Sequence, residues 1–170
     1  MKVAPADRPS ARGLHVAILS SAFNAPVVEG LTAGAKEALA EMGARTRDVE
    51  AWVVPGAFEL PLGAQAAART GRFDAVIALG AVIRGETDHY EHVAREAASG
   101  LAAVSLETGV PVGFGVLTVE KEAQALARSA PGPDNKGGEA ARAAVAMVHL
   151  LRRLGGRRRR AGRRPKGKRT

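Results

Sequence analysis

Short apolar segments alternate with helical patterns along almost the whole chain, and this alternation limits the possible folds most strongly. Four segments are short, apolar and rich in β-branched residues, as buried strands are: 14–20, 49–56, 73–83 and 111–118. Apolar residues recur at helical spacing between and after them, over 26–43, 58–70, 88–108, 120–129 and 137–154. This repetition predicts a three-layer α/β sandwich with a four-stranded parallel sheet. We expect a flavodoxin-like arrangement, although the strand order does not follow from the sequence.

Positive charge is concentrated at the C-terminus. The chain has a net charge of +8, but residues 152–170 carry eleven Lys and Arg and no acidic residue. The remaining 151 residues hold fourteen basic and seventeen acidic side chains, a net charge of −3. We therefore predict a flexible N-terminal segment at 1–13, one domain at 14–154 and a basic disordered tail at 155–170. The tail either keeps the protein in solution or binds a polyanion.

Several classes of protein are excluded by what the sequence lacks. There is no cysteine, which excludes disulfides, thiolate zinc sites and cysteine nucleophiles. The N-terminus, MKVAPADRPSARG, has no apolar region of the kind found in secretory signals. No apolar run approaches the ~20 residues of a membrane span. We therefore expect a cytoplasmic protein that does not bind membranes.

Unusual residues cluster at the carboxyl ends of the predicted strands, where open parallel sheets bind ligands. SSAFNAP follows the first strand and holds Phe23, placed in a turn where its ring can stack on a planar ligand. VPGAFELP follows the second strand and holds Phe58 and Glu59. Phe58 either packs in the core or contacts a ligand. RGETDHYEH follows the third strand, and Phe114 lies within the fourth.

The stretch GETDHYEHV, after the third strand, has the pattern of a helix start. Asp88 and Glu91 have the D-x-x-E spacing of a capping box, which places His89 at the first helical position. There the helix dipole favours a neutral imidazole, the form that a base requires. The amides around Glu86, Thr87 and His89 are well placed to bind a phosphate.

The same stretch also raises the question of a metal site. His89 and His92 are three residues apart, which can place two ligands together. No third histidine or cysteine lies at a recognisable ligand spacing, so we predict that no metal is bound. We expect His92 to be partly buried by packing.

Five segments resemble the lumazine synthase family. They are AFN (22–24), VPGAFELP (54–61), GAVIRGETDHYEHV (80–93), GFGVLT (113–118) and NKGGEAA (135–141). The resemblance runs in one order from residue 14 to residue 154. It implies condensation of 5-amino-6-(D-ribitylamino)uracil with 3,4-dihydroxy-2-butanone 4-phosphate, giving 6,7-dimethyl-8-ribityllumazine, phosphate and water. This is the penultimate step of riboflavin biosynthesis, and it needs neither a metal nor an organic cofactor.

The resemblance implies a role for each matching residue at the pyrimidine. Phe23 resembles the residue that stacks on the pyrimidine ring, and Glu59 resembles the residue that accepts hydrogen bonds from ribityl hydroxyls. Ala57 and Phe58 resemble the rest of the turn that holds the ribityl chain. The strand end whose backbone binds the uracil edge corresponds to Ala81, Val82 and Ile83.

At the second substrate, the resemblance implies both phosphate binding and proton transfer. Glu86 and Thr87 match positions that bind the butanone phosphate, chiefly through backbone amides and the threonine hydroxyl. Arg128 matches a phosphate-binding arginine, whose guanidinium suits that ligand. His89 matches the catalytic histidine and is interpreted as the proton-transfer residue.

The resemblance also implies an assembly. Phe114 resembles an aromatic residue that a neighbouring subunit contributes to the site, and Lys136 falls on a basic residue near it. Shared sites imply a homo-oligomer built on pentamers: one pentamer, a pair, or a sixty-subunit shell. The chain departs from the family pattern in its tail and in SAPGPDN (129–135), where two prolines and Asp134 stiffen the loop. An alternative is a catalytically silent, shell-forming homologue whose tail binds nucleic acid or other polyanions.

Overall fold

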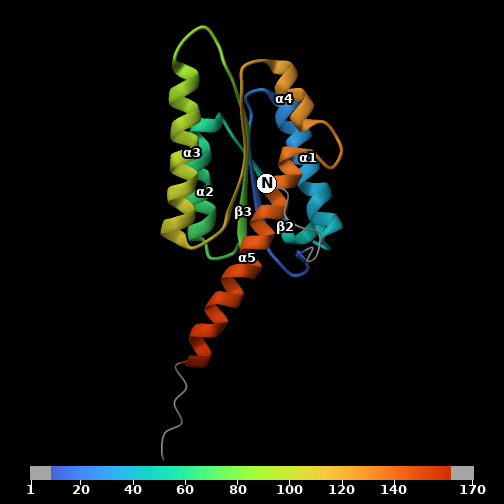
Figure 1. Cartoon of the computed structure of the whole chain (residues 1–170), viewed down its shortest axis with the longest axis vertical. Helices are drawn as coiled ribbons and strands as arrows, with labels where there is room; N and C mark the ends of the chain where they lie inside the picture. Colours follow the sequence, from blue (N-terminus) through green and yellow to red (C-terminus); the bar gives the residue numbers. More distant parts are fainter. Residues whose placement is uncertain (1–8, 162–170) are drawn as a thin grey trace, which may run out of the picture.

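The computed structural model describes residues 9–161, with side chains for residues 9–155, as a three-layer α/β sandwich (Figure 1). Its four strands are parallel and follow the order β2-β1-β3-β4. They are β1 (Val16–Ser21), β2 (Val49–Val54), β3 (Ala75–Ile83) and β4 (Val112–Val119). This order is that of flavodoxin-like sheets, so the predicted fold class is confirmed.

Helices cover both faces of the sheet (Figure 1). One layer holds α1 (Ala25–Glu41), α4 (Glu122–Ser129) and α5 (Lys136–Ala161), and the other holds α2 (Leu60–Arg69) and α3 (His89–Thr108). The short 3-10 helices η1 (Thr46–Asp48) and η2 (Ala57–Glu59) lie at the two ends of β2. Ile77 and Leu79 of β3 join the core under α1 and α5, whereas Val76 and Ala78 join the core under α2 and α3. Because both faces are covered, β3 is a continuous apolar run.

The helix predicted after the first strand forms as α1. Before it, Asn24 adopts the left-handed conformation at φ 60, and Gly43 follows it at φ 88. The positive φ of Gly43 suits a residue just past a helix end. The sequence predicts an apolar face of Val28, Leu31, Ala35, Leu39 and Met42. The first four are no more than 3% exposed, whereas Met42 is half-buried.

The described structure extends beyond both predicted domain boundaries. Ala11 is fully buried and its amide donates to Met42 O at 2.8 Å, so residues 9–13 contact the domain. α5 continues to Ala161, past the predicted end at 154. The rest of the predicted N-terminal segment and tail, residues 1–8 and 162–170, lies outside the described residues. Between residues 9 and 161, none of the helices has both the length and the apolar character needed to cross a membrane.

Candidate active site

The segments that leave β1, β2 and β3 meet at the carboxyl edge of the sheet. Ala22 N donates to Val54 O at 2.8 Å, and Asn24 Nδ2 donates to Ala81 O at 2.8 Å. The turn after β1 is thus bonded to the end of β2 on one side and to the end of β3 on the other. These bonds place Phe23 beside the other two strand ends, at the predicted ligand-binding edge.

Phe23 projects into solvent at this edge. Its side chain is 72% exposed, more than any other aromatic residue in the described part of the chain. An exposed ring at a ligand-binding edge suits stacking on a planar molecule. The role of Asn24 was not predicted, although asparagine tolerates the left-handed conformation better than most residues. The signal for it was the AFN sequence directly after a strand.

The turn after β2 carries the predicted ribityl-binding residues on η2. Ala57 is buried, Glu59 is half-buried and Phe58 is 58% exposed. The exposure of Phe58 argues against core packing, one of its two interpretations. Glu59 Oε2 lies 3.0 Å from the position that a Cβ on Gly56 would occupy. Gly56 therefore leaves room for the carboxylate to fold back over the turn.

The last residues of β3 extend beyond β1. Pairing with β1 stops before Ala81, whereas pairing with β4 continues to Ile83. Ala81 O accepts from the turn after β1, and Arg84 N donates to β4 at 2.9 Å. Backbone groups alternate in direction along a strand, so those of Ala81 and Ile83 face the β1 side and those of Val82 face β4. Of the three predicted residues, Ala81 and Ile83 thus direct their backbone groups to the side of the turn after β1, and Val82 does not.

α3 begins at His89, as predicted, but the predicted capping box is absent. Asp88 has φ −70 and ψ −1, and its side chain makes no capping hydrogen bond. A capping side chain reaches the first helix amides from an extended backbone, which Asp88 does not have. Glu91, the predicted partner, instead pairs with Arg84 at 3.4 Å. The capping-box prediction is wrong, and the place of His89 at the helix start is confirmed.

Both histidines of this stretch are exposed. The prediction that His92 is partly buried by packing is therefore wrong; its Nδ1 instead lies 3.1 Å from Arg95 Nη2 at the surface. The reason is that α3 turns other residues, such as Ala97 and Leu101, toward the core. Among the side chains of residues 9–155, no group of three or more His, Cys, Asp or Glu could hold a metal ion.

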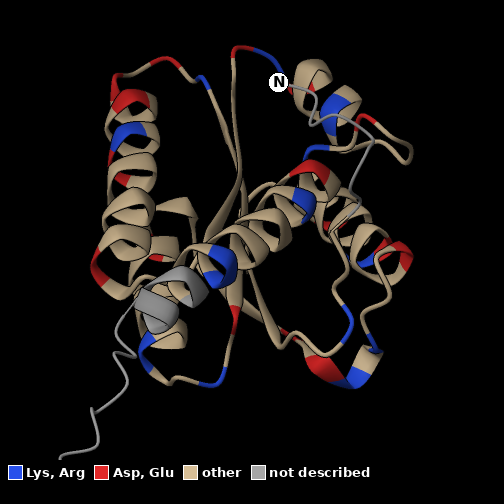
Figure 2. Ribbon diagram, turned by 60° about the horizontal axis from the view of Figure 1, so that its bottom comes forward, with Lys and Arg blue, Asp and Glu red and all other residues tan. Residues whose placement is uncertain are grey.

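Arg84, which was not predicted as a site residue, connects three elements at this edge. Its guanidinium lies 3.0 Å from the carboxylate of Glu120, just after β4, and 3.4 Å from that of Glu91 on α3. It also lies over the ring of Tyr90, 4.7 Å from the centroid. The hydrogen bond and charge of Glu120, with a smaller contribution from Glu91, raise the pKa of Arg84. Figure 2 shows charged residues on the segments leaving β3 and β4.

The two predicted basic residues flank the loop between α4 and α5. Arg128 lies in the last turn of α4 and donates from Nη1 to Gln124 O at 2.9 Å. Lys136 begins α5, and its Nζ lies 2.7 Å from Glu139 Oε1. Thus each basic side chain already has a partner within its own helix.

Asn135 holds that loop in place. It is 3% exposed, and its Nδ2 donates to three carbonyl oxygens: Gly30 at 3.1 Å, Ser129 at 2.8 Å and Ala130 at 3.1 Å. Its Oδ1 accepts from the amides of Gly137 at 2.9 Å and Gly138 at 3.1 Å. One side chain thus joins α1, the end of α4 and the start of α5. NKGGEAA contains this asparagine, but the sequence pattern did not reveal its partners.

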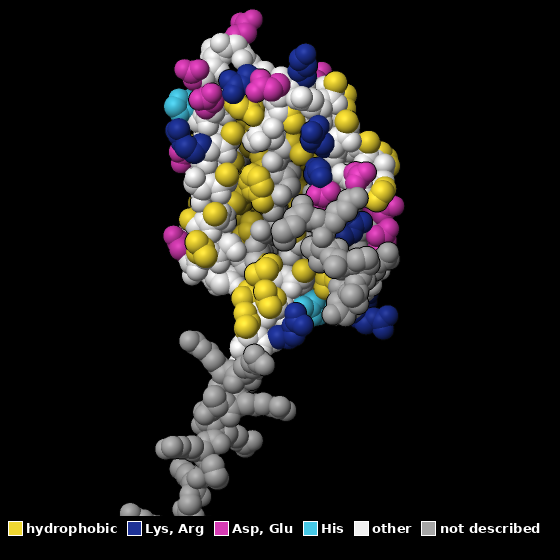
Figure 3. Space-filling view, viewed as in Figure 1, with side chains coloured by type: hydrophobic (Ala, Val, Ile, Leu, Met, Phe, Trp, Pro, Cys, Tyr) yellow, Lys and Arg dark blue, Asp and Glu magenta, His cyan; other side chains and the backbone are white. Residues whose placement is uncertain are grey.

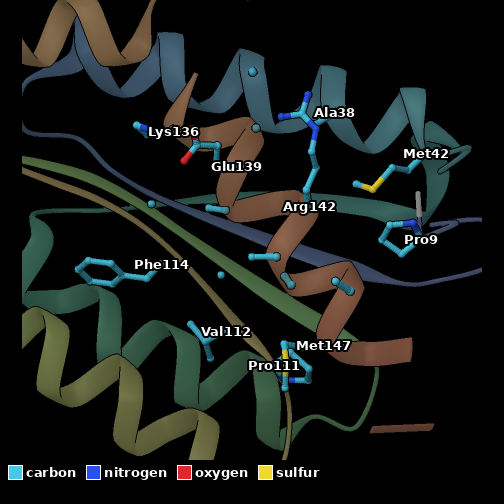
Figure 4. A pocket seen from close by; sticks show the side chains of 18 of the residues that line it. Pro9, Ala38, Met42, Pro111, Val112, Phe114, Lys136, Glu139, Arg142 and Met147 are labelled. Carbon is cyan, nitrogen blue, oxygen red and sulfur yellow. Dashed lines mark hydrogen bonds and ion pairs between the residues drawn. The ribbon is translucent and has the colours of Figure 1, made fainter. Parts of the chain in front are cut away.

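Phe114 and Lys136 line an open groove rather than the carboxyl edge. The groove has a volume of about 1720 Å³ and runs along β4 between α3 and α5. Figure 3 shows apolar side chains along the middle of this face, and in Figure 4 Phe114 lies across from Lys136 on α5. Phe114 is 48% exposed. It lies about 16 Å along β4 from the end of the strand, at ~3.3 Å per residue. It therefore does not reach its own chain's carboxyl edge.

Comparison with known proteins identifies the family. The model of the 6,7-dimethyl-8-ribityllumazine synthase family matches residues 13–152. A protein of that name from Syntrophus aciditrophicus is 48% identical over 144 residues, covering 85% of this chain and 94% of the relative. Another, from Deinococcus radiodurans, is 46% identical over 144 residues, covering 85% and 93%. The chain therefore belongs to the 6,7-dimethyl-8-ribityllumazine synthase family, a family of transferases in riboflavin biosynthesis.

Proposed function

We propose that this protein condenses 5-amino-6-(D-ribitylamino)uracil with 3,4-dihydroxy-2-butanone 4-phosphate to form 6,7-dimethyl-8-ribityllumazine. The observation that carries the proposal is the convergence at one sheet edge of an exposed ring, a carboxylate and a helix start with a histidine. These are Phe23, Glu59 and His89, from three different strand ends. Each matches a position that the family resemblance assigns to one of the two substrates.

The geometry suggests how the first substrate is held. The exposed ring of Phe23 stacks on the pyrimidine, and the outward backbone groups of Ala81 and Ile83 bind the uracil edge. Glu59 accepts hydrogen bonds from the ribityl hydroxyls at the turn after β2. These contacts orient the reacting amine, and holding two reactants together supplies much of the rate enhancement in reactions of this kind.

The second substrate binds where α3 begins. Amides of residues 85–87 at the positive end of the helix dipole bind the phosphate, with the Thr87 hydroxyl, and Arg128 adds positive charge. The amine attacks the ketone and a first water leaves as the imine forms; phosphate is then eliminated, and the ring closes with loss of a second water. His89, exposed at the first helical position, carries protons to and from the reacting atoms.

Formation of the fluorescent lumazine from both substrates tests this function. His89→Ala is expected to lower kcat by about 100-fold or more. His92→Ala is the matched control, because His92 is exposed one turn later on the same helix and its side chain bonds only Arg95 among the described residues. It should keep nearly full activity. If the wild-type assembly forms no lumazine, the proposed function is wrong.

The position of Phe114 supports a site shared between subunits. Its ring lines a groove about 16 Å from its own chain's carboxyl edge. Any substrate that Phe114 contacts is therefore bound at the carboxyl edge of another subunit. A homo-oligomer built on pentamers is the proposed assembly. Native mass spectrometry should give a multiple of five chains of 17.6 kDa. A fully active monomer would contradict the shared site.

Polyanion binding by the basic tail is the second proposed function. Eleven Lys and Arg without an acidic residue in 152–170 support it, and an assembly would make the binding multivalent. RNA affinity of the full chain should fall steeply with salt and be lost on deletion of 155–170. Such binding without lumazine formation would favour a catalytically silent shell. RNA affinity that survives the deletion would show that the tail is not the binding element.

The proposed location of the enzyme is the cytoplasm.

A further inference from the structure

Arg84 stands at the point where the proposed phosphate-binding loop leaves the sheet. It is the first residue after β3, and its amide donates to Val119 O at 2.9 Å. Its guanidinium reaches forward past the loop to Glu91, in the first turn of α3, and sideways to Glu120. The segment 85–88 therefore lies between the backbone of Arg84 and the carboxylate that its side chain binds.

The segment 85–88 is otherwise weakly held. All four residues are exposed. Within the described part of the chain, no side-chain hydrogen bond involves any of them, and the side chain of Asp88 does not cap the helix. The start of α3 is tied to the sheet by the contacts of Arg84 with Glu91 and with the ring of Tyr90, and by the packing of Tyr90 and Val93 against the core.

The charges around Arg84 oppose an anionic ligand. Glu91 and Glu120 both lie within ion-pair distance of the one guanidinium, so the cluster carries a net charge of −1. Without Arg84 the charge becomes −2, immediately beside amides that would receive a phosphate. Because these side chains are partly exposed, solvent screens the interaction, and its effect is moderate rather than decisive.

We propose that Arg84 is a positioning residue that sets phosphate affinity by offsetting one of the two negative charges that Glu91 and Glu120 place beside the loop 85–88. The guanidinium acts through the two carboxylates and does not itself bind the phosphate, because both carboxylates already occupy it. This inference rests on the proposed function, which places the phosphate at this loop.

Kinetics of charge variants test the inference. Arg84→Met keeps the aliphatic stem and removes the charge. We expect about a tenfold rise in KM for the butanone phosphate, with KM for the pyrimidine unchanged. Combining Arg84→Met with Glu91→Gln and Glu120→Gln should bring KM back toward the wild-type value. A purely structural role, or a direct contact with phosphate, predicts no such recovery, so its absence overturns the proposal.

A matched control is available at the other end of β3. Arg72 pairs with Glu50 and lies over the ring of Phe73, 4.9 Å from the centroid, as Arg84 does with its acids and Tyr90. Arg72→Met should leave both KM values unchanged. A rise in KM for the butanone phosphate equal to that of Arg84→Met would mean that general loss of structure explains the effect, which overturns the proposal.

Two further measurements keep the inference testable. If Arg84→Met does not fold, Glu91→Gln with Glu120→Gln in the Arg84 background should lower KM for the butanone phosphate severalfold, and an unchanged KM overturns the proposal. Calorimetric titration with inorganic phosphate measures phosphate affinity without turnover, for Arg84→Met and for the double glutamine variant, each against the wild type. If the wild type forms no lumazine, the proposed function fails, and weaker phosphate binding by Arg84→Met still supports the inference. Equal phosphate binding by the two proteins overturns it.

Discussion

Replacing Asn135 with alanine should destabilise the protein by about 2–4 kcal/mol. The amide oxygen accepts two backbone amides of α5, and the two N–H groups are shared among three carbonyl oxygens. The side chain thus supplies four hydrogen bonds. At about 1 kcal/mol net for each bond, their loss is worth about 4 kcal/mol. Water that reaches some of the freed backbone groups reduces this to about 2 kcal/mol.

Equilibrium unfolding in urea measures the effect. Protein concentration must be held constant, because the stability of an oligomer depends on it. Asp134→Ala is the matched control: Asp134 is the exposed neighbour, and none of these bonds involves it. Its free energy of unfolding should stay within about 0.5 kcal/mol of the wild type. The amides of Gly137 and Gly138 should also exchange faster in Asn135→Ala. A loss below about 1 kcal/mol would refute the idea that Asn135 holds α4 and α5 together.

Three further predictions concern single residues. Gly34→Ala should cost about 1–3 kcal/mol in urea unfolding, because the new Cβ would overlap Oδ1 and Cγ of Asn135 and stand 2.6 Å from its Nδ2. Wild-type stability would show that the contact relaxes freely. Phe23→Ala should change stability by less than about 0.5 kcal/mol but raise KM for the pyrimidine about tenfold, and an unchanged KM would exclude stacking. The hydrogen bond from Arg45 lowers the pKa of Asp48, a 3%-exposed carboxyl group, below its ordinary 3.8. The ion pair therefore stabilises the fold above pH 3.8, and this contribution is lost as the pH falls through the lowered pKa. Asp48→Asn should therefore lose stability at pH 7 and show a smaller further loss during acid titration below pH 3.8; an unchanged acid titration would contradict the ion pair.

The layers of the fold could be predicted because they depend on local sequence. The run that became β3 is apolar at successive residues, which is typical of a strand covered on both faces. Its neighbours in the chain have helical spacing, and Gly43 ends α1 where a positive φ is needed. A parallel sheet with helices on both sides follows from these local patterns. The strand order does not, since it depends on contacts between distant segments.

The missed features of the site are one local competition for a carboxylate and two long-range side-chain contacts. Glu91 had the spacing of a capping box, but the guanidinium of Arg84 competes for its carboxylate and Asp88 lacks the extended backbone that capping requires. Asn24 reaches Ala81 across 57 positions of sequence, and Asn135 reaches Gly30 across 105. Spacing along the chain carries no signal for such pairs. It indicated which residues lie at the strand ends, but not what they bind there.

A crystal structure of the protein with the ribitylaminouracil and inorganic phosphate tests the central claim most directly. The account predicts the pyrimidine stacked on Phe23 with its edge on the backbone of Ala81 and Ile83, and the phosphate on the amides of residues 85–87 close to His89. A pyrimidine bound in the groove along β4, touching neither Phe23 nor the end of β3, would contradict it.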